Sequence, residues 1–589
     1  MSLPSSVPNV LGETSLADFD VLIIGSGAGG SAAAYVLTKP PANLKVLILE
    51  AGDNLFPGLD DPSPDMPVPL YSNDEIKLSV RYFDTQDPVV EPRTLRASAN
   101  QTALPNPDVN VLSRTVGGTT VHADMKYPRF NVVDFQMKTK LEEAGRFPSG
   151  TTFADWPLTY DELEPFYAMA EQLTGVAGTM TGTDADIFAS HRSIDYPMPP
   201  VPPMYVGLML ADAARRAGHH PIAYPAGINS RPYDGRPPCV SCGFCSGYGC
   251  PNNSKGSAAV TTLRKALLSG NCQLRFNCFA RRLVTDGGGQ HVTAVEYIDN
   301  DGMVQTAAAK QFILAASAME SARLCFLSGG LGNGTDQLGR HVMFHRQTQA
   351  VGIYKQRLHG ERGLSVTNGM ADFRGVNPGG TGFATDRRPL GGIIEFGTSS
   401  EPIVSGTAAL QALAVGHLFG SDIGVKQLLI ESPFHAHLAV MIMQAEDAPQ
   451  ATNRVDLDPT VRDVFGLKVV RLTYTAHDFE ISAANHYAPL MMHVHELAGA
   501  QFSFIDPTST AVPRSRHVMG GLRMGDDRTT SVCDKYGKFH DVDNLYCMDG
   551  GVFVTSSGYN PTLTIIALAL RAAGNLVQPG SAERVLRSR

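Results

Sequence analysis

The chain has 589 residues, with 48 Lys and Arg against 57 Asp and Glu, which gives a formal net charge of −9. This length corresponds to roughly three or four domain-sized units, or to fewer large ones. A charged fraction of 18% beside 43% hydrophobic residues excludes a disordered or coiled-coil protein. Acidic residues are dispersed and no basic stripe could neutralise a phosphate backbone, so nucleic acid is not an expected partner.

The sequence predicts no membrane span. Its longest uncharged stretch, 402–421, is interrupted by Pro, Ser, Thr, Gln, His and Gly, whereas a helical span needs about 18 or more consecutive apolar residues. Residues 1–20 lack the basic and apolar regions of a signal peptide. The cytoplasm is therefore the expected compartment.

The first strong signal is a strand, turn and helix pattern near the N-terminus. An apolar run at 21–24 stops at Gly25, and Gly25, Gly27 and Gly30 form a GxGxxG motif that opens a helix. A second apolar run then ends at Glu50. This is the pattern of a βαβ unit that binds a dinucleotide.

Each part of this motif has its own physical reason. One glycine makes the tight turn, one lets the backbone approach a pyrophosphate, and one lets the helix pack on the strand. The helix N-terminus presents unsatisfied amides to the phosphates. Glu50 is placed to accept hydrogen bonds from an adenosine ribose.

The middle of the chain alternates between irregular and regular segments. Residues 54–74 are proline-rich without a period, which predicts a loop or lid. A helix is predicted to begin after Thr159, which forms a capping box with Glu162, and to end at Gly175. From 274 to 327 the pattern predicts strand, turn, strand and helix, with GG and DG turns.

The last part of the chain contains a second β-rich region and a return to the first pattern. Residues 351–506 are broken by glycines and rich in strand signals, so a second domain is expected there. A strand at 544–549, a glycine-rich turn and a helix that begins at Pro561 then close the sequence.

These segments together resemble the glucose-methanol-choline family of flavoprotein oxidoreductases over nearly the whole chain. The matching segments are IIGSGAGG with Glu50, RTVGGTTVHADM, DWPLTYDELEPFY, FILAASAMESARLCFLSG, HVMGGLRMG and LYCMDGGVFVTSSGYNPTLTIIALALRAA. The block SCGFCSGYGCPNNSKGS is most similar to the large subunits of bacterial gluconate, fructose and glucose dehydrogenases. The tail also resembles pyranose oxidase.

The resemblance implies an α/β fold, in which a Rossmann-like FAD-binding domain of discontinuous segments accompanies a β-sheet-rich substrate-binding domain. The FAD-binding domain is expected to comprise residues 1–58, 105–180, 251–345 and 507–589. The substrate domain, which includes the lid loop and the Cys-rich loop, is expected to comprise 59–104, 181–250 and 346–506.

The resemblance also assigns residues to the FAD cofactor. These are Gly25, Gly27, Gly30 and Glu50 at the adenosine half, Arg114, Gly117, Gly118 and Thr119 at the pyrophosphate and flavin, and Asp549, Pro561 and Thr562 near the ribityl chain and pyrimidine edge. One position departs from the family pattern, because Ser317 stands where a glycine is expected.

Alcohol oxidation requires a base for the hydroxyl proton and an acceptor for the hydride. His517 and Asn560 match the family's catalytic His and its Asn partner. A histidine accepts a proton near neutral pH, and an amide orients the substrate oxygen without competing for that proton. His122 lies where some family members bind the flavin covalently, and the sequence leaves open whether it does so or only packs near the ring.

Four of the nine cysteines lie close together. Cys239, Cys242, Cys245 and Cys250 stand in a C-x2-C-x2-C-x4-C-P block with intervening glycines. Thiolates on such a loop suit one iron–sulfur cluster. Structural zinc, disulfides and free thiols are the alternatives.

The expected activity is FAD-dependent oxidation of a primary or secondary alcohol group, of a sugar or sugar derivative, to a carbonyl. A non-sugar alcohol substrate, or a non-catalytic electron-relay flavoprotein, is the alternative. An electron-acceptor protein or small subunit is a candidate partner, and such large subunits are sometimes exported with a partner that carries the signal. The β-rich region holds several histidines that are expected to be structural: His417, His435, His437, His486, His493 and His495.

Overall fold

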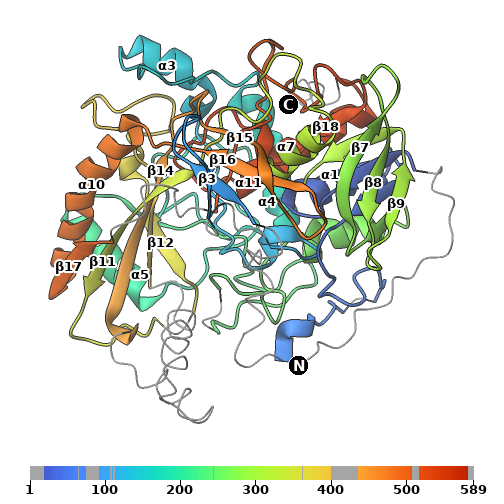
Figure 1. The fold of residues 1–589 in the computed structure, drawn as a ribbon. Coiled ribbons are helices and arrows are strands. Elements are labelled where there is room, and N and C mark those ends of the chain that lie inside the picture. Colours follow the sequence, from blue (N-terminus) through green and yellow to red (C-terminus); the bar gives the residue numbers. More distant parts are fainter. Residues whose placement is uncertain are drawn as a thin grey trace, which may run out of the picture.

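The computed structural model describes residues 19–63, 65–73, 92–106, 109, 113–242, 245–360, 363–398, 435–506 and 516–580. The uncharged stretch at 402–421 and His417 lie outside these residues. The described residues pack into four β-sheets with helices on and between them (Figure 1).

The first sheet is parallel and has the strand order β18-β10-β1-β2-β6. Its strands are β1 (Val21–Ile24), β2 (Val46–Leu49), β6 (Cys272–Arg275), β10 (Gln311–Leu314) and β18 (Leu545–Cys547). The side chains of β1 and β2 are buried throughout, as expected for apolar strands that are covered on both faces. The predicted βαβ unit is confirmed, and segments far apart in sequence complete its sheet.

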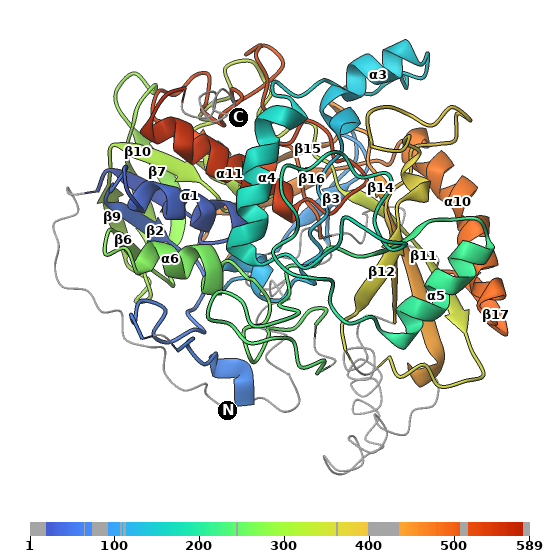
Figure 2. The ribbon, with the colours of Figure 1, turned by 180° about the vertical axis from the view of Figure 1, so that it is seen from behind.

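Three helices pack together beside this sheet, as Figure 2 shows: α1 (Ala28–Thr38), α11 (Thr562–Val577) and α4 (Tyr160–Thr174). The predicted start of α4 is confirmed, because Thr159 accepts a hydrogen bond from the amide of Glu162 and the Glu162 side chain returns the capping interaction. Gly175 ends this helix in the left-handed conformation with φ 76°. The helix predicted from Pro561 is α11.

The second large sheet is antiparallel, with the order β17-β11-β14-β13-β12-β5. Its strands are β5 (Pro221–Ala223), β11 (His345–Ile353), β12 (Val366–Met370), β13 (Ile394–Thr398), β14 (Leu438–Glu446) and β17 (Phe502–Ile505). Helices α5 (Tyr205–Arg216) and α10 (Asp478–Leu497) cover it, on the left of Figure 1. The β-rich character predicted for 351–506 is confirmed.

Two smaller sheets complete the described structure. One pairs β15 (Arg454–Arg462), β16 (Lys468–Thr473), β3 (Thr94–Arg96) and β4 (Leu104–Pro105). The other contains β7 (Phe279–Thr285), β8 (Val292–Ile298) and β9 (Val304–Ala308). After β9 the chain returns to the parallel sheet through β10 and continues into α7 (Ala318–Leu327). The predicted GG and DG turns connect β7, β8 and β9, so that prediction is also confirmed. The described residues also form two short helices, α3 (Met137–Glu143) and α6 (Arg264–Leu267), of which α6 contacts α1 and β6.

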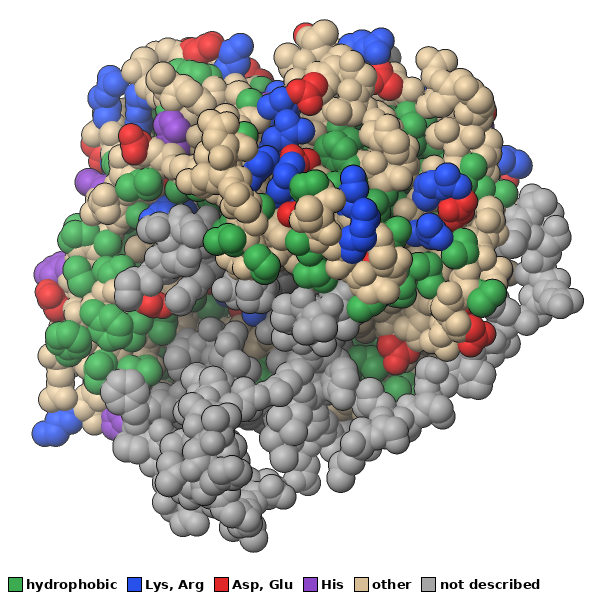
Figure 3. Space-filling view, viewed as in Figure 1, with side chains coloured by type: hydrophobic (Ala, Val, Ile, Leu, Met, Phe, Trp, Pro, Cys, Tyr) green, Lys and Arg blue, Asp and Glu red, His purple; other side chains and the backbone are tan. Residues whose placement is uncertain are grey.

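The surface and the helices agree with the charge and hydropathy analysis. Lys, Arg, Asp and Glu side chains are interspersed on the face drawn in Figure 3. Within the described residues, no helix combines the length and apolar character that crossing a membrane requires.

Candidate active site

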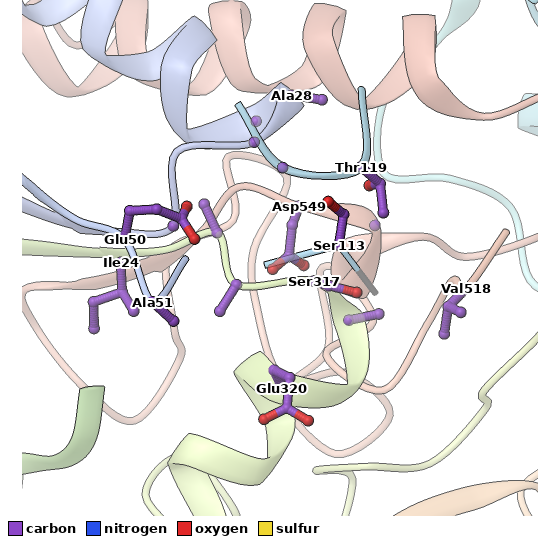
Figure 4. A pocket seen from close by; sticks show the side chains of 18 of the residues that line it. Ile24, Ala28, Glu50, Ala51, Ser113, Thr119, Ser317, Glu320, Val518 and Asp549 are labelled. Carbon is purple, nitrogen blue, oxygen red and sulfur yellow. The ribbon is translucent and has the colours of Figure 1, made fainter. Parts of the chain in front are cut away.

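A cavity opens at the carboxyl ends of the parallel strands. Its lining includes Ile24 and Gly25 after β1, Glu50 after β2, and Asp549 after β18. In Figure 4, Glu50 and Val518 stand at opposite sides of the cavity, and Asp549 lies between them. The carboxyl edge of an open parallel sheet is the usual ligand site of such folds.

Three helices begin at this cavity. The lining contains Ala28 at the start of α1, Ala318 at the start of α7, and Thr562 at the start of α11. None of these three helix starts has a side-chain cap hydrogen bond. Their N-terminal amides and partial positive charges therefore favour an anion such as a pyrophosphate.

The glycines of the GxGxxG motif differ in their surroundings. Gly25 has φ 102°, and a Cβ there would overlap the carbonyl of Ala315. A Cβ on Gly30 would overlap the carbonyl of Gly25, so this glycine lets α1 pack on the strand. Gly27 has φ −70°, and apart from its chain neighbours the only described residue within 4 Å of a Cβ there is Gly118, whose Cα lies at 3.9 Å. The protein itself does not require glycine at 27, which faces the cavity.

Glu50 connects the end of β2 to the glycine turn. Its carboxylate accepts hydrogen bonds from the amide and hydroxyl of Ser26, at 2.9 and 2.6 Å, and from the amide of Gly52 at 2.9 Å. Ser26 Oγ in turn accepts a hydrogen bond from the amide of Gly117 at 2.9 Å. Glu50 lines the cavity and also fixes the loop that carries Gly117 and Gly118, a structural role that sequence analysis did not predict.

Asp549 is buried at the mid-part of the cavity. It accepts hydrogen bonds from the Ser321 hydroxyl at 2.5 Å and from the amide of Gly551 at 2.8 Å. Burial raises the pKa of its carboxyl group above the ordinary value, and these hydrogen bonds oppose the rise. The side chain is therefore held in one orientation beside the start of α7.

Most of the residues predicted to bind the cofactor or to act in catalysis line this cavity. The lining contains Gly25, Gly27, Glu50, Arg114, Gly118, Thr119, His517, Asp549, Pro561 and Thr562, whereas Gly30, Gly117, His122 and Asn560 lie outside it. The open space against Gly27 and the three helix starts fit a dinucleotide. The residues present are therefore suited to hold the cofactor that the fold implies.

Ser317 lies at this cavity with unusual backbone angles. Its φ is 81° and its ψ is 148°, a backbone conformation that residues other than glycine seldom adopt. The family pattern leads us to expect glycine here, and the backbone retains the glycine-like conformation despite the serine.

His517 borders the cavity and contacts a second histidine. Its Nδ1 lies 2.8 Å from Nδ1 of His345, and the ring planes are at 86° to each other. The other ring nitrogen of His345, Nε2, lies 3.1 Å from the carbonyl oxygen of Ser556. Burial, together with His345 and Lys126, lowers the pKa of His517 well below its ordinary value. His517 is therefore a neutral imidazole at pH 7, which is the form a base requires.

Asn560 is buried, and both ends of its amide are engaged. Its Oδ1 accepts a hydrogen bond from the Tyr224 hydroxyl at 2.6 Å, and its Nδ2 donates to Glu395 at 3.1 Å. Glu395 also receives the ammonium group of Lys126 at 2.7 Å. Asn560 thus belongs to a buried polar network, and sequence analysis missed Tyr224, Glu395 and His345 because no local motif marks them.

His122 is buried at the end of the short helical turn 118–121. Burial lowers the pKa of its imidazole to about 3, and Arg516 and Lys255 add to the effect. Its backbone carbonyl accepts a hydrogen bond from the amide of Gly247 at 3.1 Å. The ring is therefore neutral at pH 7, and it is the backbone of His122 that contacts the Cys-rich loop.

The iron–sulfur cluster predicted for that loop is not supported. All nine cysteines are free, and the described residues contain no group of three or more His, Cys, Asp or Glu side chains placed to hold a metal ion. Instead, the Cys250 thiol donates to Asn252 at 3.0 Å, and burial raises the pKa of the Cys239 and Cys245 thiols. Of the alternatives, free thiols agree with the described residues, in which the cysteines form no disulfide and no grouping suited to zinc is found.

The Cys-rich loop is held in another way. The buried ammonium group of Lys255 donates hydrogen bonds to the backbone carbonyls of Ala123 and Tyr248 at 2.9 Å and to that of Cys245. A cation on backbone carbonyls thus fixes the fold of this loop, and the spacing of the cysteines did not reveal it.

The sequence matches family models in the segments that build the site. Two models described as GMC oxidoreductase match residues 209–347 and 449–569, and one described as an NAD(P)-binding Rossmann-like domain matches residues 23–89. The first two include His345, His517 and Asn560. The third includes the glycine turn and Glu50.

Curated relatives extend the match over nearly the whole chain. The chain is 27% identical to the gluconate 2-dehydrogenase flavoprotein of Pantoea cypripedii, over 94% of this chain and 92% of the relative. It is 29% identical to 2-methyl-1,2-propanediol dehydrogenase of Mycolicibacterium austroafricanum, over 95% of each. It is 26% identical to the fructose dehydrogenase large subunit of Gluconobacter japonicus, over 94% of this chain and 97% of the relative.

Solved structures show the same fold. Pyridoxine 4-oxidase from Mesorbium loti covers 94% of this chain and is itself covered over 98%, with a TM-score of 0.61 at 17% identity. This likeness confirms the α/β architecture predicted from the sequence. The family models and the relatives show that this chain is an oxidoreductase of the GMC family.

Proposed function

We propose that the protein binds FAD in the cavity and oxidises an alcohol group of a sugar or sugar derivative to a carbonyl, with His517 as the base. The observation that carries this proposal is the neutral His517 at the cavity wall, whose Nδ1 contacts His345. The GMC membership and the flavoprotein relative support the choice of cofactor.

The residues of the cavity would divide the work of holding FAD. Gly27 and the start of α1 would receive the pyrophosphate, and Glu50 the adenosine ribose. Thr119, Asp549 and Thr562 would lie along the flavin half. We also retain the two-domain division predicted from the sequence, since the parallel strands and the long antiparallel strands form two separate sheets.

Bound FAD would supply the acceptor for the hydride that leaves the alcohol carbon. His517 would accept the hydroxyl proton on the nitrogen that does not face His345. Its low pKa keeps it unprotonated at neutral pH, so the base form is already present before the substrate binds. Asn560, whose amide is held by Tyr224 and Glu395, would lie beside the reacting hydroxyl and help to orient it.

The relatives support the substrate class. Those named for gluconate and fructose act on sugars or sugar acids, and one named for 2-methyl-1,2-propanediol acts on an aliphatic diol. Because one relative is a large subunit, an electron-acceptor protein is the partner that we propose for reoxidation.

Anaerobic reduction of the purified yellow protein tests this proposal. Gluconate, fructose, other sugars and 2-methyl-1,2-propanediol are added separately, and the flavin absorbance is followed. Bleaching by a sugar or sugar acid is the expected result. Bleaching by the diol alone would replace the sugar with an aliphatic alcohol, and a colourless folded protein that reduces NAD would overturn the assignment of FAD.

A further inference from the structure

His345 faces His517 because of a backbone pairing between two distant segments. Met343 and Met519 exchange two backbone hydrogen bonds, at 2.8 and 3.0 Å, in an antiparallel bridge. Two residues further along each strand, an antiparallel register brings His345 opposite His517. The contact between the two rings is thus built into the backbone pairing and does not depend on a chance rotamer.

The hydrogen-bond partners define which ring nitrogen carries each proton. The Ser556 carbonyl can only accept, so Nε2 of His345 must donate to it. Burial lowers the pKa of His345 to about 4, so this ring is neutral and its Nδ1 bears a lone pair. Nδ1 of His517 must then donate to His345, which places the lone pair of neutral His517 on Nε2.

We infer that His345 is a positioning residue, which fixes both the orientation and the tautomer of His517 so that Nε2 acts as the base. This inference rests on the proposed function of His517. Many catalytic bases are held in orientation by a further side chain, and here we assign that orienting role to the neutral His345.

The charges around the pair are consistent with this role. Lys126 opposes a positive charge on His517, whereas Asp124 favours one. Arg374 opposes protonation of His345, and the Ser556 carbonyl favours it. When His517 takes a proton on Nε2, its Nδ1–H continues to donate to the His345 lone pair, so no proton has to move along the pair.

Two amide variants at residue 345 separate the two hydrogen bonds. In His345→Asn the amide oxygen lies near the position of Nδ1 and can still accept from His517. In His345→Gln the amide reaches the position of Nε2 and can donate to Ser556, but the acceptor for His517 is lost. Both variants are polar and neutral, so they are matched in the cost of burial.

The first measurement reads the tautomer directly and requires no substrate. Nitrogen-15 NMR of histidine-labelled holoenzyme identifies the His517 signals as those absent from His517→Ala. We expect His517 to carry its proton on Nδ1 in the wild type and in His345→Asn, and to populate the Nε2–H form in His345→Gln. The same tautomer in all three proteins would overturn the inference.

The second measurement is the anaerobic rate of flavin reduction. We expect His345→Gln to lower the rate by about 10- to 100-fold, since a misplaced base loses about this much, and His345→Asn to lose only a few-fold. A double variant, His345→Gln with His517→Ala, should be no slower than His517→Ala alone. A further loss in the double variant would contradict a role exercised through His517.

His495 provides a matched control. It is also fully buried, and its ring bridges the Tyr354 hydroxyl at 2.8 Å and the Ala350 carbonyl at 3.0 Å, away from His517. His495→Gln should leave the His517 tautomer and the reduction rate unchanged. If no alcohol reduces the flavin, the proposed function fails, but the tautomer measurement still decides the role of His345.

Discussion

Gly27 lies 3.9 Å from Gly118, measured from an ideal Cβ on Gly27 to the Cα of Gly118, and apart from its two chain neighbours no other described residue comes within 4 Å of that Cβ. Because the backbone at 27 is also unstrained, with φ −70°, the protein alone gives no reason for glycine. A ligand that lies against the backbone gives that reason, since a side chain would take its place.

Gly27→Ala should therefore leave the apoprotein folded but weaken FAD binding. We expect a stability loss of about 1 kcal/mol from the poorer helix N-cap, and a clear fall in FAD retained per chain after gel filtration. Gly287→Ala is the control, because a Cβ at 287 would meet nothing within 4 Å. Full FAD retention by Gly27→Ala would argue against a dinucleotide at this turn.

Ser317→Gly should stabilise the protein. Ser317 has φ 81°, and such backbone strain costs about 1 to 3 kcal/mol. Glycine relieves this strain, but its greater entropy in the unfolded chain offsets part of the gain in stability. A net gain of about 1 kcal/mol in the free energy of unfolding is expected from urea titration. Ser317→Ala retains the strain and should show no gain; an Ala variant more stable than Gly would refute this interpretation.

Asn560→Ala should affect stability and rate together. It removes the partners of Tyr224 and Glu395 in a buried network, so the free energy of unfolding should fall by about 2 to 4 kcal/mol. The rate of flavin reduction should fall by less than in His517→Ala, because Asn560 takes no proton. Tyr224→Phe, which removes only one of these hydrogen bonds, should cost about half the stability; equal effects on rate from Asn560→Ala and His517→Ala would contradict the assigned roles.

Stability should decrease as the pH falls from 6.5 to about 4. Burial lowers the pKa of His345 and His495 from 6.5 to about 4, so in this range the unfolded chain binds more protons than the folded one. Acid therefore lowers the free energy of unfolding, by up to about 3 kcal/mol for each histidine. Above pH 6.5 this contribution to stability is fully present. In urea titrations across this range, the free energy of unfolding should depend less steeply on pH in His495→Gln than in the wild type. An unchanged slope against pH would contradict the burial of a neutral His495 ring.

Local signals predicted the elements that are defined within a short stretch of chain. The glycine turn, the capping box of Thr159 with Glu162, and the start of α11 at Pro561 each depend on neighbours a few residues away. The family resemblance then supplied His517 and Asn560, which no local pattern singles out.

The contacts of those two residues could not be predicted, because they depend on distant pairing. His345 meets His517 only through the bridge between Met343 and Met519, and Asn560 meets Glu395 only where β13 reaches the tail. The iron–sulfur prediction is not supported, for a related reason. The spacing of the thiols is local, whereas Lys255, which holds their loop, acts through backbone carbonyls.

The central claim is that His517 accepts the proton of an alcohol whose hydride reduces bound FAD. The direct measurement is anaerobic stopped-flow reduction of the flavin in the wild type and in His517→Ala, with FAD content and circular dichroism as controls. We predict that His517→Ala keeps its FAD and its fold but is reduced about 10²- to 10⁴-fold more slowly. An unchanged rate in His517→Ala, with FAD still bound, would contradict the account and assign the base to another residue.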